Sequence, residues 1–137
     1  MVPQRRNDSL ENWDLFVLRH QNLKNVAVHT VSCAMFWLGP ILAVLVHPIN
    51  WLMFFGSGLV GTAGHYFFKD GTVDAREATS SLQVVVFSTL MTFLFLRGQY
   101  QQEILRVQKK WTDYKSGLIP SHADLELFGK LRSEVSS

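Results

Sequence analysis

Histidines are the residues of this chain whose type and position could do chemistry. Four of the five, His20, His29, His47 and His65, lie in or beside its most apolar part. An ionisable group at membrane depth is costly, so such groups are candidates for function. Imidazole is also the commonest metal ligand, and three imidazoles on one ion leave positions open for water, oxygen or a chelating substrate. The other interpretation is that these histidines only form hydrogen bonds or pack.

The spacing groups three of these histidines. Asn25 and His29 are four residues apart and share one helical face. His20 precedes His29 by nine residues, so the two converge only if the helix breaks between them, and residues 21–22 offer a break because Asn favours turns. His65 ends the second apolar segment where the first begins, which predicts that His29 and His65 lie at similar depth. His47 lies beside Pro48 at the opposite end, where we expect a loop.

Composition determines the class of protein. The chain has 137 residues, 47% of them hydrophobic and 18% charged, and no Asp, Glu, Lys or Arg occurs from Val26 to Phe68. A soluble domain of this size cannot bury so long an uncharged run. These features exclude a soluble enzyme, a disulfide-stapled domain and a disordered chain. The net charge of +2 gives no basic stripe for nucleic acid, so we expect no nucleic-acid partner.

We therefore expect an all-α fold, a small integral membrane helical bundle forming one domain over residues 1–137. It has an N-terminal amphipathic helix capped by Ser9, about three hydrophobic segments and a C-terminal amphipathic helix. The expected ranges are 9–23 for the first helix, 26–46 and 49–68 for two spanning helices, 81–96 for a short apolar segment, 99–118 for the second amphipathic helix and 119–137 for a tail.

Two of these segments have features of their own. The segment 81–96 reaches only ~24 Å, short of a ~30 Å hydrocarbon core, and a full crossing there would oppose the positive-inside rule. Either this segment is re-entrant or split into a hairpin, or the rule fails here, and we favour a segment that does not cross the bilayer simply. Gly58, Gly61 and Gly64 form a stripe of small residues that allows another helix to approach closely.

The histidine pattern resembles a known family. Residues 18–20 (Leu-Arg-His), Asn25-x-x-x-His29 and, after one helical hairpin, Gly64-His65 are similar to motifs of the Mpo1-like family of small membrane proteins, formerly DUF962. The resemblance spans about residues 13–97. It implies an iron-dependent dioxygenase that shortens 2-hydroxy fatty acids by one carbon in the endoplasmic reticulum. It further implies that His20, His29 and His65 bind Fe2+ and that Asn25 orients a ligand or the substrate.

The chain departs from the family after Gly64-His65. Lys69 stands where the family has an acidic residue, the Pro-Ala that usually follows is missing, and the fourth hydrophobic segment is reduced. Lys69 could pair with a substrate carboxylate, or it could be a lysine snorkelling at the membrane boundary. Asp70 is adjacent, but on a continuous helix it would point about 100° away and would not replace the acid.

Three functions remain open. The first is an iron-dependent membrane oxygenase of a fatty acid, in the endoplasmic reticulum membrane of a eukaryote or the inner membrane of a bacterium. The second is a non-catalytic adaptor or assembly protein that uses its glycine stripe and C-terminal helix to hold a membrane protein partner or a second copy. The third is a subunit with a histidine-ligated haem, which a Soret band would reveal.

Overall fold

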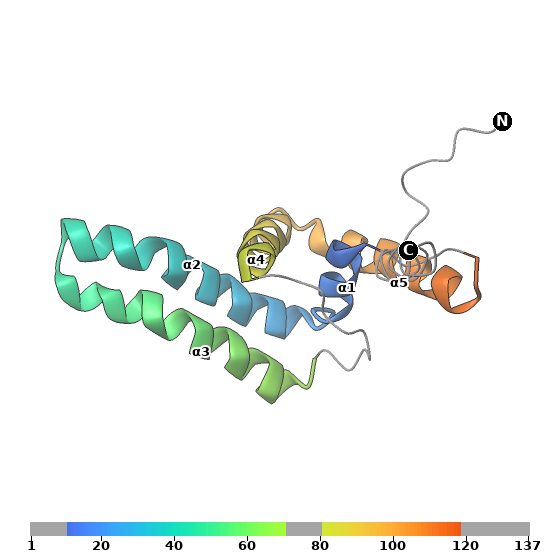
Figure 1. Ribbon diagram of the computed structural model, residues 1–137, viewed down its shortest axis with the longest axis horizontal. Coiled ribbons are helices and arrows are strands. Elements are labelled where there is room, and N and C mark those ends of the chain that lie inside the picture. The colour runs from blue at the N-terminus through green and yellow to red at the C-terminus, as the bar shows by residue number, and fades with distance from the viewer. Residues whose placement is uncertain (1–10, 71–80, 119–137) are drawn as a thin grey trace, which may run out of the picture.

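The structure, a computed structural model, describes residues 11–70 and 81–118, and within these ranges the chain is helical (Figure 1). The expected tail over residues 119–137 lies outside the described residues. In chain order the elements are α1 (Asn12–Leu18), α2 (Leu23–Leu45), a short 3-10 helix η1 (Pro48–Asn50), α3 (Trp51–Phe68), α4 (Ser81–Leu96) and α5 (Tyr100–Lys115).

The two longest helices form an antiparallel hairpin. α2 and α3 lie side by side along their length (Figure 1). Gly39 allows the close approach, because a Cβ there would lie 2.8 Å from the backbone nitrogen of Phe54. The turn begins at His47, whose Nδ1 accepts a hydrogen bond from the Ile49 N–H at 3.1 Å. His47 is therefore a turn residue, as its position beside proline predicted.

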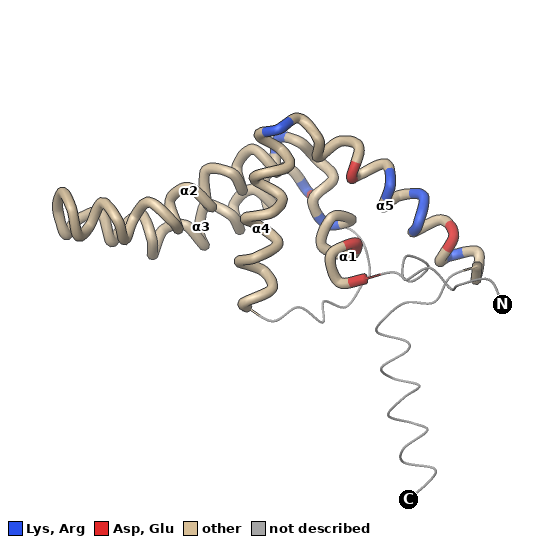
Figure 2. Tube along the Cα trace, turned by 90° about the horizontal axis from the view of Figure 1, so that it is seen from above, with Lys and Arg blue, Asp and Glu red and all other residues tan. Residues whose placement is uncertain are grey.

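The far half of this hairpin exposes apolar side chains. Val44 and Leu59 are 77% and 76% exposed. Figure 2 shows no charged residue on this arm, whereas charges gather on α1, α5 and the adjoining connections. Among the described helices, α2, with 23 residues, has both the length and the composition needed to cross a membrane. α3 has 18 residues with several glycines, and its spanning role stays a prediction.

The buried core lies at the other end, where α1, α4 and α5 meet the start of α2. It consists of Leu15, Phe16, Val17, Leu18, Val26, Met91, Tyr100, Ile104 and Val107. The apolar face of α5, formed by Tyr100, Ile104 and Val107, packs into this core. Leu118 follows the end of the helix and is 74% exposed.

A buried carboxylate joins α1 to α5. Asp14 contacts Arg106 and Lys110 at 2.9 Å each, and it also accepts the Glu11 N–H at 3.0 Å as part of a capping box. Glu11 is therefore the N-cap of α1. The predicted cap at Ser9 is wrong because α1 begins only at Asn12, and Ser9 itself lies outside the described residues.

α4 is one uninterrupted helix that runs across the α2–α3 pair (Figure 2). The expectation of a hairpin within this segment is therefore wrong, and its depth in a bilayer stays a prediction. Thr89 binds α4 to α2, since its hydroxyl accepts the Trp37 indole N–H at 3.1 Å and lies 3.8 Å from Cys33 Sγ. This crossing brings α4 against the side of the hairpin that bears the histidines.

Candidate metal centre

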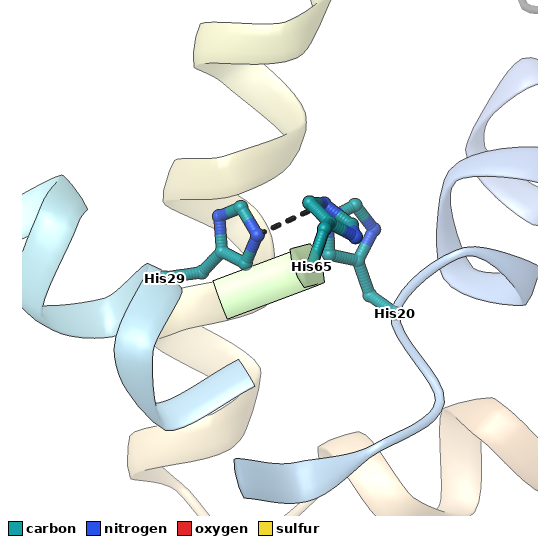
Figure 3. A group of neighbouring side chains, drawn as sticks. All are labelled: His20, His29 and His65. Atoms are coloured by element: carbon teal, nitrogen blue, oxygen red, sulfur yellow. Dashed lines mark hydrogen bonds between the residues drawn. The ribbon is translucent and has the colours of Figure 1, made fainter. Parts of the chain in front are cut away.

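His20, His29 and His65 come together from three parts of the chain (Figure 3). One nitrogen from each lies within 4.8 Å of the others, and the Nε2 atoms of His29 and His65 are 3.1 Å apart. The break predicted at residues 21–22 is confirmed. Asn22 caps α2 by accepting the Lys24 N–H, so the chain turns after α1 and directs His20 towards α2 and α3.

His20 is held in one orientation by its neighbours. Its ring stacks on Phe16 at 4.2 Å, its Nδ1 lies 2.7 Å from the Phe16 carbonyl, and the Tyr100 hydroxyl donates to the His20 carbonyl at 3.0 Å. A carbonyl can only accept, so Nδ1 bears the proton and Nε2 keeps its lone pair. The side chain is buried, and burial lowers the pKa of His20 to about 3. At physiological pH the His20 imidazole is therefore neutral, and its Nε2 lone pair can bind a metal ion.

Asp70 takes a place that the sequence did not predict. α3 ends at Phe68, and Lys69 adopts a left-handed conformation with φ 47°. This turn sends Asp70 back to the start of α2, where its carboxylate accepts the backbone N–H groups of Gln21 and Asn22 at 3.2 and 2.9 Å. The expectation that Asp70 points about 100° away is wrong because the helix ends before it.

Asp70 also reaches the histidine cluster through Asn25. The Asn25 amide nitrogen donates to Asp70 Oδ2 at 3.1 Å and lies 3.4 Å from His65 Nδ1. His65 Nδ1 also lies 3.3 Å from the Asp70 carbonyl, which can only accept, whereas the Asn25 amide nitrogen can only donate, so the two neighbours favour opposite tautomers of His65. Partners of this kind orient metal-binding imidazoles.

The glycine stripe serves this site. A Cβ at Gly64 would overlap Asn25 Oδ1, and one at Gly61 would lie 3.2 Å from the His29 ring. Asn25 Oδ1 is buried, and no hydrogen bond to it is found in the described parts of the chain. The small residues of α3 therefore make room for the side chains of α2 that form the cluster.

Lys69 lies outside the cavity beside the histidines. Its side chain is exposed and is not among the residues that line the cavity beside the histidines. Its observed contribution is the backbone turn that ends α3 and returns Asp70 to α2. Of the two non-histidine candidates, Asn25 lies in the cluster and Lys69 does not.

The donor set fits a divalent transition metal. Two neutral imidazole lone pairs 3.1 Å apart repel unless one nitrogen donates a proton or both bind one cation. Metal–nitrogen bonds of ~2.0–2.1 Å place ligand nitrogens about 3–4 Å apart. The 3.1 Å pair meets this spacing, whereas all three nitrogens lie within 4.8 Å and would move slightly closer on binding one ion. Imidazole suits zinc, copper, iron and nickel alike. A cavity of about 370 Å³ adjoins the histidines and offers space for further ligands.

No protein-family model matches this chain, and neither a curated protein nor a solved structure does. The resemblance to the Mpo1-like family therefore depends on the motif residues alone.

Proposed function

We propose that the chain is an iron-dependent membrane oxygenase that acts on a fatty acid, most simply a 2-hydroxy fatty acid. The observation that supports this proposal best is the convergence of His20, His29 and His65 beside a cavity at the base of the apolar hairpin. A metal centre with open positions at that place suits a substrate with a chelating polar head and a long apolar tail.

Each residue of the cluster has a defined task in this proposal. His20, His29 and His65 present neutral nitrogens to the ion, and Asn25 with Asp70 holds His65 in orientation. Phe16 shields His20 from water. Bound ferrous iron would supply the redox chemistry with O2.

The overall reaction balances without another reductant. The bond between C1 and C2 of the acid breaks, C1 leaves as CO2, and C2 becomes the carboxyl carbon of an acid one carbon shorter. One O2 is reduced with four electrons from the acid, and one water forms. The proposed location is a small bundle in the endoplasmic reticulum membrane of a eukaryote or the inner membrane of a bacterium.

The adaptor alternative has less support, because both features on which it depended are engaged within the chain. Gly61 and Gly64 face His29 and Asn25, and the apolar face of α5 packs into the core with α1 and α4. A partner would have to use other surfaces.

The test is elemental analysis of detergent-purified protein beside two variants. We expect near-stoichiometric iron in the parent and in His47→Ala, whose histidine lies at the opposite end of the hairpin, and none in folded His65→Ala. The iron-loaded parent should show no Soret band. It should consume O2 and release CO2 when 2-hydroxypalmitate is added.

The control arms separate the alternatives. Absence of metal from all three proteins after anaerobic ferrous reconstitution would refute the oxygenase. A Soret band lost in His65→Ala would indicate haem instead. Equal iron in the parent and His65→Ala would place the metal elsewhere.

A further inference from the structure

A second cavity lies next to the one beside the histidines. It has a volume of about 400 Å³ and lies between α2, α3 and α4. Its walls are mostly apolar and include Cys33, Phe36, Trp37, Phe54, Phe55 and Val85. The two cavities share the lining residues Ser32, Gly58, Val84 and Ser88, so they adjoin one another between the histidines and the aromatic residues.

We propose that this apolar cavity binds the alkyl chain of the substrate acid, and that Gly58 is the residue that lets the chain pass. The inference rests on the proposed function, because it assumes that the carboxylate end lies at the histidines. It adds the path of the chain and the residue that decides which chain lengths are accepted.

The order of the walls fits an acid lying with its head at the histidines. Three histidines line the first cavity, and Ser32 and Ser88 line the shared junction. The far cavity is mostly aromatic and aliphatic, and its Ser57 and Thr89 hydroxyls already donate to helix carbonyls. The Ser32 hydroxyl is already used, since it donates to the Ser57 carbonyl at 2.7 Å. Polarity thus decreases with distance from the metal-binding nitrogens, as it does along a fatty acid.

The dimensions of the path agree with an alkyl chain. From His29 to Phe36 along α2 is seven residues, or about 10 Å at 1.5 Å per residue. An extended chain with C–C bonds of ~1.5 Å advances roughly 1.3 Å per carbon, so about eight carbons cover this distance. An acid of six carbons therefore stays near the histidines, whereas a 16-carbon acid must enter the apolar cavity.

Gly58 lines both cavities and is the position at which the proposed path can be obstructed. It is exposed, and a Cβ there would meet nothing within 4 Å, so there is open space for a side chain to begin at the junction. Gly56, two residues earlier, lines neither cavity, and its Cβ would lie 3.6 Å from the flexible end of Met35. The same substitution at the two positions therefore separates obstruction of the path from a general effect on α3.

The first experiment compares Gly58→Leu with Gly56→Leu, both loaded with ferrous iron. For Gly58→Leu we expect kcat/KM for 2-hydroxypalmitate to fall about tenfold or more, with less than a twofold change for 2-hydroxyhexanoate. Gly56→Leu should resemble the parent with both acids, and iron content should be equal in all three. An equal loss for both acids, or no loss for the long one, would overturn the proposed path.

A second experiment does not depend on turnover. Palmitic acid with a diazirine at carbon 8 should crosslink the parent within residues 33–37 or 84–89, as mapped by mass spectrometry, and Gly58→Leu should lose these crosslinks. Crosslinks confined to other segments would refute the binding site. Crosslinks at the expected segments in a protein that oxidises neither acid would instead refute the proposed reaction and leave the binding site standing.

Discussion

Asp70 connects the end of α3 to the start of α2 and to Asn25 in the histidine cluster. The Mpo1-like pattern has an acidic residue at the position of Lys69 in this chain. The left-handed turn at Lys69 returns a carboxylate to the site from one position later. It does not face the cluster directly, but holds the start of α2 and the amide of Asn25.

Replacement of Asp70 should therefore weaken metal binding without abolishing it. In Asp70→Asn we expect iron affinity to fall about 10–100-fold, because the partners that orient metal-binding histidines have effects of this size. The measurement is competition for ferrous iron with a chelator under anaerobic conditions. Lys69→Gln is the matched control and should bind iron as the parent does. An unchanged affinity for ferrous iron in Asp70→Asn would show that Asp70 does not contribute to metal binding.

Burial of His20 predicts a pH dependence of stability in the metal-free protein. The pKa of His20 is lowered to about 3 by burial, whereas in the unfolded chain it is near 6.5. Below pH 6.5 the unfolded state therefore binds a proton that the folded state does not, and stability falls as the pH is lowered towards 3. Thermal unfolding in detergent between pH 7.5 and 5 should show this loss, and His20→Gln should flatten it. An identical dependence of stability on pH in the parent and His20→Gln would show that His20 is not its source.

At the scale of elements, the site depends on how closely α2 and α3 approach. Gly64→Ala should separate the helices or displace Asn25, because the new Cβ would overlap Asn25 Oδ1. We expect a loss of about 1–3 kcal/mol in stability together with weaker iron binding. Gly56→Ala introduces the same helix-favouring residue without a clash and should be neutral or slightly stabilising. Chemical unfolding and iron titration of both variants check this, and equal behaviour would refute it.

The sequence could predict elements that depend on hydropathy and short-range spacing. Apolar runs gave the segments occupied by α2, η1 with α3, and α4, and Asn22 gave the break that brings His20 inward. Features that depend on tertiary contacts were harder to predict from the sequence. α1 ends at Leu18, short of its predicted range, because the chain turns at residues 19–22, and α4 is one helix that contacts α2 through Thr89.

Asp70 is a case in which a local signal existed. Asp70-Gly71 is a dipeptide typical of turns, and it could have indicated that α3 ends before Asp70. The partners of its carboxylate lie 45 to 49 residues earlier in the chain, and nothing in the spacing predicts those contacts. Tyr100, which holds the His20 carbonyl across 80 residues, was missed for the same reason.

At the scale of the whole molecule, charge and apolar surface are separated. The charged residues lie on the core end and the far hairpin is uncharged, so we expect the hairpin to enter the bilayer and the histidines to stay near its basic, cytoplasmic boundary (Figure 2). In Cys33→Ser protein in sealed vesicles, His47→Cys and Lys24→Cys should react with a membrane-impermeant maleimide from opposite sides. Reaction of both from the same side would refute a hairpin that crosses.

The position of His20 between two parts of the fold has a further consequence. His20 follows α1 and belongs to the core end, whereas His29 and His65 belong to the α2–α3 hairpin. An ion bound by all three would link the two parts, so its binding energy would be available only after both had assembled. Metal loading would then act as a checkpoint of biogenesis, since a hairpin inserted without its docked partner helices would lack the third ligand.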